Sequence, residues 1–120
     1  MVLVDTSVWV AHLKWANRNL AKLLYSTQVM THDFVIGELA CGNLKNRKEV
    51  LALLERLPRA PLVSQEEILY FIEQQSLMGK GIGFVDVHLL ASAKLRSLYL
   101  WTLDASLNRI ANRFELDYQS

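Results

Sequence analysis

In the segment LVDTSVW, residues 3–9, an apolar stretch is followed directly by an acidic residue, and the interpretation of the sequence starts there. An apolar run typical of a buried strand ends there on the carboxylate of Asp5, and two hydroxyl residues, Thr6 and Ser7, follow at once. A buried carboxylate without a partner loses its hydration, so it protonates, pairs with another group or binds a cation. Because almost no chain precedes Asp5, its partner has to come from a distant segment.

The composition is that of a globular protein of ordinary domain size. Of the 120 residues, 52% are hydrophobic and 21% are charged, which suffices for a core of its own. We therefore expect one domain over residues 1–120. The formal net charge of +1 argues against a broadly basic surface for nucleic acid but leaves room for a local basic rim.

Two further features bear on where the protein works. Residues 1–4 are too short an apolar run for a secretion signal, and no stretch reaches the roughly 18 apolar residues that a membrane span needs. The single cysteine, Cys41, cannot form an intramolecular disulfide, and its apolar neighbours predict a small buried side chain. We expect a soluble cytoplasmic protein.

Short apolar strands alternate with helices along the chain. Strands are expected at residues 2–4, 27–32, 60–63, 98–102 and 116–118, and helices at 7–14, 18–26, 34–41, 47–57, 64–78, 86–96 and 105–113. Thr6 or Ser7 is the expected cap of the first helix, Asp33 that of the third, and Ser64 with Glu67 forms a capping box. This alternation predicts an α/β domain with a mainly parallel central sheet.

Four acidic residues lie inside otherwise apolar segments. Asp5 and Asp104 follow strands, Asp86 opens a helix and Glu38 lies in the middle of one. Because ligands bind beyond the carboxyl ends of parallel strands, the four could converge on one pocket there. Clustered carboxylates repel one another unless a divalent cation is present, and hard oxygen ligands favour Mg²⁺ or Mn²⁺ over Zn²⁺. Taken singly, each acid can also be explained as a helix cap or as a solvent-facing side chain.

Four segments together resemble a known family. These are VDTSVW at 4–9, GEL around Glu38, FVDVHLLASA at 84–93 and LWTLD at 100–104. They resemble the PIN-domain family, in particular its VapC-type toxin ribonucleases of type II toxin–antitoxin systems, over nearly the whole chain. The resemblance implies a Rossmann-like α/β/α sandwich and Mg²⁺- or Mn²⁺-dependent hydrolysis of RNA phosphodiesters. The acids it implies, as catalytic residues and metal ligands, are Asp5, Glu38, Asp86 and Asp104.

The same resemblance implies partners and supporting groups. Thr6 or Ser7 would support the first acid or a bound water, a cognate antitoxin would block the acidic pocket, and the chain would form a homodimer. Two alternatives on the same fold stay open: a housekeeping nuclease without an antitoxin, and a non-catalytic module that binds RNA or protein. A receiver-type phosphotransfer domain is disfavoured, because adjacent acids after the first strand and a lysine after the last are missing.

Other conspicuous residues have more ordinary explanations. The GKGIG segment, residues 79–83, lacks the spacing of a phosphate-binding loop and is expected to be a flexible loop, although Lys80 could touch RNA. His88 is expected to be structural. The basic run at residues 45–48 is typical of a solvated surface that could contact phosphate. Trp9 and Trp15, on early helices expected to be exposed, are candidates for a partner-binding surface.

Overall fold

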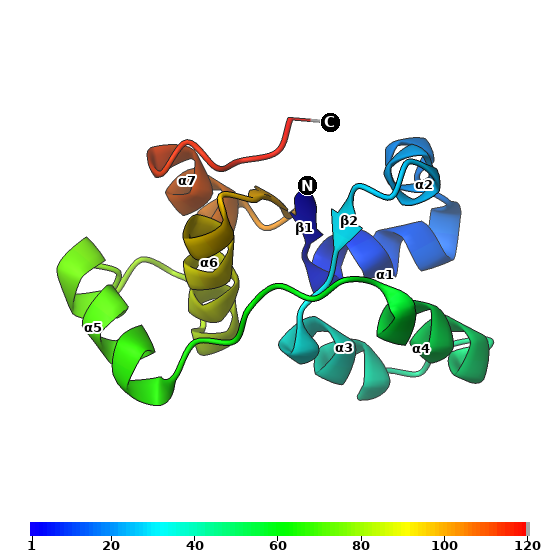
Figure 1. Cartoon of the computed structure of the whole chain (residues 1–120), viewed down its shortest axis with the longest axis horizontal. Helices are drawn as coiled ribbons and strands as arrows, with labels where there is room; N and C mark the ends of the chain where they lie inside the picture. The colour runs from blue at the N-terminus through cyan, green and yellow to red at the C-terminus, as the bar shows by residue number, and fades with distance from the viewer. Residues whose placement is uncertain (120) are drawn as a thin grey trace.

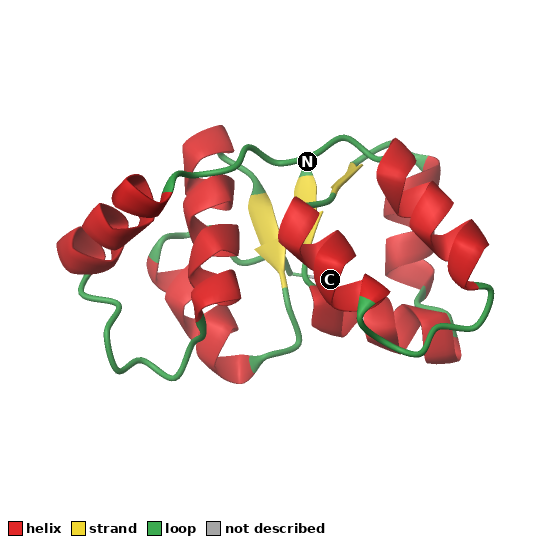
Figure 2. Cartoon of the chain, turned by 90° about the horizontal axis from the view of Figure 1, so that it is seen from below, coloured by secondary structure: helices red, strands yellow, loops and turns green. Residues whose placement is uncertain are grey.

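A parallel three-stranded sheet forms the centre of the computed structural model, which describes residues 1–119. β1 (Val2–Val4) lies between β2 (Val29–Met30) and β3 (Tyr99–Trp101), and pairs with both in parallel. Val2 is opposite Val29 on one side and Tyr99 on the other. Helices flank the strands on both sides (Figure 2), which explains why β1 is apolar and buried at every position.

The described residues form seven helices. These are α1 (Thr6–Trp15), α2 (Arg18–Tyr25), α3 (Asp33–Ala40), α4 (Arg47–Arg56), α5 (Gln65–Gln75), α6 (Phe84–Arg96) and α7 (Ala105–Arg113). Figure 1 shows α1 to α4 toward one end of the molecule and α5 to α7 toward the other, with the strands between them. The α/β fold with a parallel central sheet, and its α/β/α layering, are therefore confirmed.

Helix α6 is the most deeply buried helix and positions part of the candidate site. All residues from Val87 to Ala93 are buried, so every face of this segment packs against neighbouring elements. It joins the core around Leu3, Val4 and Leu100, which are fully buried. Because burial fixes the axis of α6, its first turn is held in place as well. That turn carries Asp86.

The two predicted outer strands shrink to single bridges. At 60–63 no strand forms; only Thr31 and Arg59 make a parallel bridge, and the ladder stops there because the segment that contains Thr31 turns into α3 directly after it, with His32 as the cap. At 116–118 only Asp117 bridges, to Leu100. The predictions of strands at these two places were wrong in extent, although both segments do lie beside the sheet.

Several helix boundaries differ from the predicted ones because of side-chain caps and backbone turns. Asp5, rather than Thr6 or Ser7, caps α1, since its carboxylate accepts the Thr6 N–H. His32, rather than Asp33, caps α3. Helix α5 ends at Gln75 and not at Met78, because Ser76 adopts a left-handed conformation with φ of 53°. Helix α6 begins at Phe84, two residues before Asp86.

The capping box at the start of α5 is confirmed. The Ser64 hydroxyl accepts the Glu67 N–H at 3.1 Å, and the Glu67 carboxylate accepts the Ser64 N–H at 3.1 Å. The same two hydrogen bonds lower the pKa of the Glu67 carboxyl. This cap depends only on neighbours three residues apart, which is why it could be predicted from the sequence.

Two predictions about burial were wrong. Cys41 is exposed, because it follows the last turn of α3 while Leu39 takes the buried position on that helix. Trp9 is 1% exposed and belongs to the core, so it cannot form a partner-binding surface, whereas Trp15 is 78% exposed. Among residues 1–119, no helix combines the length and the apolar character that crossing a membrane requires.

Candidate active site

Asp5 lies at the carboxyl end of β1, and three hydrogen bonds hold its carboxylate. It is 6% exposed. One oxygen accepts the backbone N–H of Thr6 at 2.8 Å. The other accepts the hydroxyls of Ser7 at 2.8 Å and of Thr102 at 2.7 Å. The hydroxyl dipoles stabilise the negative charge and fix the orientation of the group, so the acid that ends the first strand is satisfied without a basic partner.

Thr102 is the residue that the sequence interpretation missed. It follows β3, is 7% exposed, and its hydroxyl both donates to Asp5 and accepts the backbone N–H of Asp104 at 3.0 Å. It therefore ties the ends of β1 and β3 together at the edge where the acids lie. A threonine directly after an apolar strand that pairs with β1 was the available signal, but its partner is 97 residues away.

Glu38 is brought to the same edge by Thr6. Glu38 is on the exposed face of α3, and its Oε1 accepts the Thr6 hydroxyl at 2.6 Å. The two hydroxyls after Asp5 thus have different partners: Ser7 supports Asp5, and Thr6 supports Glu38. This bond joins α1 to α3, two helices that pack against each other.

The pKa of Asp86 is influenced by the other three acids. It is half-buried in the first turn of α6, where its Oδ2 accepts the Gly83 N–H at 3.1 Å. Its pKa is raised, chiefly by loss of hydration on burial and further by the negative charges of the acids at positions 5, 104 and 38; the Gly83 N–H opposes the shift. The four predicted acids, from four separate segments, therefore lie within electrostatic reach of one another.

Asp104 has a structural role in addition to its place in this group. It caps α7, with one oxygen accepting the N–H groups of Ser106 at 2.8 Å and Leu107 at 3.1 Å. Its side chain is exposed. The cap fixes the carboxylate at the helix N-terminus, where the helix dipole favours negative charge. Of the four acids, Asp104 has the strongest purely structural explanation.

The chemistry of these donors fits a hard divalent cation. Carboxylate and hydroxyl oxygens are the ligands that Mg²⁺ and Mn²⁺ prefer. Burial is the main reason that the pKa of Asp86 is raised, and repulsion from the other acids adds to it; a cation would relieve that repulsion. In the side-chain arrangement of residues 1–119, however, no three acids, histidines or cysteines stand close enough to enclose an ion. Side-chain movements that bring the carboxylates together would be needed to complete such a site.

The histidines of α3 and α6 are structural, as expected for His88. His32 is fully buried and its Nδ1 accepts the Phe34 N–H at 3.0 Å, capping α3. His88 is 4% exposed and packs edge-on against Phe34 and Phe84 at centroid distances of 4.8 and 4.6 Å. Burial lowers the pKa of both imidazoles, which favours their neutral forms.

Comparison with known proteins gives three findings. A family model described as "PIN domain" matches residues 2–113. "Ribonuclease VapC32" from Mycobacterium tuberculosis (strain CDC 1551 / Oshkosh) is 44% identical over 108 residues, covering 89% of this chain and 87% of the relative, and the protein from strain H37Rv gives the same values. The solved structure titled "Structure of FitAB bound to IR36 DNA fragment" has a TM-score of 0.58, with 19% identity, over 93% of this chain and 91% of that one. This last likeness bears on the fold alone.

Proposed function

This chain belongs to the PIN domain family, and on that premise we propose that it is a metal-dependent endoribonuclease that hydrolyses RNA phosphodiester bonds. The proposed catalytic and metal-holding residues are Asp5, Glu38, Asp86 and Asp104. The observation that carries the proposal is the hydrogen-bonded arrangement at the carboxyl ends of β1 and β3, where Ser7 and Thr102 hold Asp5 and Thr6 holds Glu38. The pKa of Asp86, raised chiefly by burial and further by the charges of the three other acids, agrees with this grouping. A site of this charge needs a cation when it meets a phosphodiester.

The chain's own residues orient the acids. Ser7 and Thr102 donate to one oxygen of Asp5, and Thr6 donates to Glu38, so two of the four carboxylates keep fixed directions. Orientation of this kind raises the rate because reacting groups need not reorganise. Mg²⁺ or Mn²⁺, when bound, supplies an activated water and offsets the charge on the phosphate.

The biological setting is part of the same proposal. The relative named Ribonuclease VapC32 supports a toxin of a toxin–antitoxin pair, acting in the cytoplasm and blocked by a cognate antitoxin that covers the acidic pocket. We further propose that residues 1–120 form one nuclease domain and that the chain works as a homodimer. Size-exclusion chromatography with light scattering, with and without the product of a neighbouring small gene, tests both partner assignments.

The activity is tested by cleavage of end-labelled single-stranded RNA by the full chain. We expect cleavage with Mg²⁺ or Mn²⁺ and none in EDTA. Asp5→Asn should lower the rate at least ~100-fold, because metal-assisted hydrolysis accounts for several kcal/mol of barrier lowering. Glu73→Gln, an exposed acid on α5, is the matched control and should cleave like the wild type. If Asp5→Asn cleaved RNA as fast as the wild type, the assignment of the active site would be wrong. If the wild type bound RNA but did not cleave it with either metal, the chain would be a binding module.

A further inference from the structure

A groove of about 700 Å³ leads away from the acids between α1, α3 and α4. Thr6 and Glu38, which form the bond described above, line its inner end. From there it runs along the exposed face of α1 to Trp15 and reaches the loop before α4 at Lys45. Because it shares two residues with the acidic site, whatever lies in this groove lies next to the bond that is cut.

The charge of the groove is opposite to that of the site. Lys14 and Lys45 line it and are exposed, and Arg47 and Lys48 follow in the first turn of α4. Its lining contains one acid, Glu38, whose carboxylate already accepts a hydrogen bond from Thr6. An anionic chain that approaches the acids would therefore find cationic support on this side.

Trp15 gives the groove a flat aromatic surface. It is 78% exposed, whereas Trp9 and Trp101 are 1% and 4% exposed. The Lys14 ammonium lies 5.6 Å from the centre of the Trp15 ring. An exposed indole beside a cation is the combination on which unpaired bases stack in proteins that bind single-stranded nucleic acid.

Much of the remaining lining is apolar (Val10, Leu13, Leu39, Leu44 and Val50), and two amide side chains lie among these residues. Asn43 and Asn46 are exposed and, within residues 1–119, neither makes a side-chain hydrogen bond. Asn46 stands at the cap position of α4 in a left-handed conformation, with φ of 53°, so its side chain does not bond to the helix as a cap would. Both amides are free to pair with the donors and acceptors of a base edge.

We infer that this groove binds unpaired nucleotides of the RNA adjoining the cleaved bond, with a base stacked on Trp15 and phosphates against Lys14 and Lys45. The inference rests on the proposed ribonuclease activity and specifies that the substrate is single-stranded at this position. A base inside a duplex is already stacked on its neighbours and cannot lie on the indole. The apolar part of the lining can hold the face of a base, and the cationic rim and the two amides favour RNA as the occupant.

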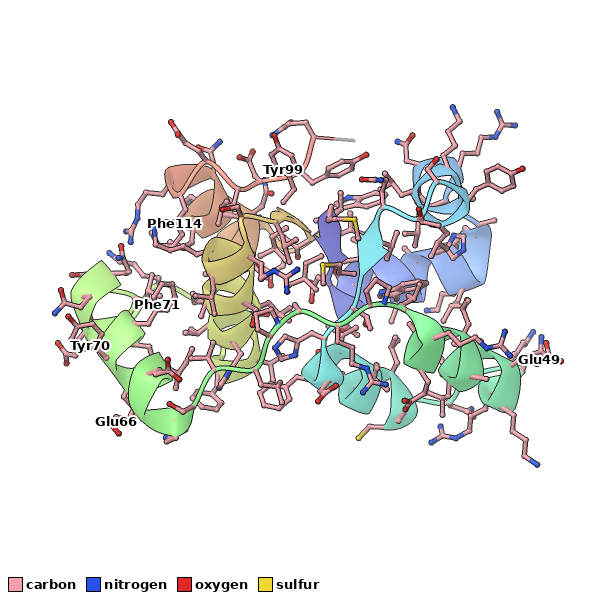
Figure 3. The ribbon with its side chains drawn as sticks, viewed as in Figure 1. Glu49, Glu66, Tyr70, Phe71, Tyr99 and Phe114 are labelled. Carbon is pink, nitrogen blue, oxygen red and sulfur yellow. The ribbon has the colours of Figure 1, made fainter. Side chains whose placement is uncertain are left out.

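The test is binding of a fluorescently labelled, unstructured 12-nucleotide RNA to the full chain in EDTA, where cleavage does not occur. Trp15→Ala should weaken binding about 5- to 150-fold, the range that corresponds to loss of one stacked base, and Trp15→Tyr should retain most of the affinity. The matched control is Tyr70→Ala, which should change the affinity less than about twofold. Tyr70 is 66% exposed on α5, toward the end of the molecule opposite α4 and Glu49 (Figure 3).

An abasic oligonucleotide of the same length separates stacking from charge. With it, Trp15→Ala should have no effect, while Lys45→Ala should weaken both oligonucleotides. Unchanged RNA affinity of Trp15→Ala, or the same loss with the abasic strand, would overturn the inference. If Trp15→Ala instead lost binding only to a co-purified antitoxin, the groove would be a protein site and the inference would be wrong.

The cleavage assay distinguishes failure of this inference from failure of the proposed function. If the wild type cleaves RNA and Trp15→Ala has an unchanged KM and RNA affinity, the proposed RNA binding in the groove is wrong and the proposed nuclease activity is supported. If the wild type binds single-stranded RNA through Trp15 but never cleaves it, the proposed nuclease activity is wrong and the proposed RNA binding in the groove is supported.

Discussion

Replacing Thr102 by valine removes the hydroxyl that joins β1 to β3 and keeps nearly the same shape. The hydroxyl donates to the buried Asp5 carboxylate at 2.7 Å and accepts the Asp104 N–H at 3.0 Å. A hydrogen bond to a charged group contributes about 1.5–3 kcal/mol, and Ser7 can replace only part of it, so we expect a loss of about 2–3 kcal/mol. With an unfolding entropy of about 2.1 cal/mol/K per residue, or ~0.25 kcal/mol/K for 120 residues, the melting temperature should fall by about 8–12 °C.

The assay is thermal and urea unfolding of the metal-free protein, followed by circular dichroism. Thr102→Ser, which keeps the hydroxyl, is the control and should lose much less. In an Asp5→Asn background the cost of Thr102→Val should drop toward the ~1 kcal/mol of a neutral hydrogen bond, because the charge is gone. A melting temperature of Thr102→Val equal to that of the wild type, or an undiminished cost beside Asp5→Asn, would refute the role assigned to this hydroxyl.

Two further predictions follow from shifted pKa values. Because burial and the neighbouring acids raise the pKa of Asp86, its ionisation opposes folding, and Asp86→Asn should stabilise the metal-free protein near neutral pH. In urea titrations this gain in stability should shrink below about pH 4, where the aspartate of the unfolded chain is also protonated. Mg²⁺ should raise the melting temperature of the wild type but not that of Asp86→Asn. Because burial and then His88 lower the pKa of His32, stability should fall as the pH drops from about 6.5 through that lowered pKa. His32→Asn can still cap α3 but does not titrate, so it should lose less stability between about pH 7.5 and pH 5 than the wild type. The measurement is the urea midpoint of both proteins at these two pH values.

Features that depend on near neighbours were predictable from the sequence. The apolar run of β1, the cap formed by Ser64 and Glu67 and the α/β alternation each depend on periodicity or on contacts three or four residues apart. Asp104 as a helix cap belongs to the same class. The lengths of the outer strands were less predictable, because pairing at a sheet edge depends on a single partner and stops where that partner ends, as it does after Thr31, where α3 begins.

Burial on the early helices shows where the local pattern is ambiguous. Trp9 and Trp15 are six residues apart on α1, and the local pattern did not show which of them would be buried; Trp9 is in the core and Trp15 is exposed. Six residues correspond to about 600° of rotation along a helix, so the two side chains point in different directions. Which direction faces the core depends on where the sheet lies, and that is a property of the packed molecule.

By itself the sequence determined the order of the elements and the kind of fold, and it indicated which four acids are candidates for the site. Only the tertiary structure decided that Thr102 supports Asp5, that Thr6 reaches Glu38 instead, and that Asp86 feels the charge of all three other acids. The physical reason is the distance along the chain between the groups that interact. A strand or a cap is stabilised by groups a few bonds away along the chain, whereas the partners of Asp5 and Thr6 lie 97 and 32 residues away and meet them only when the sheet and α3 have packed.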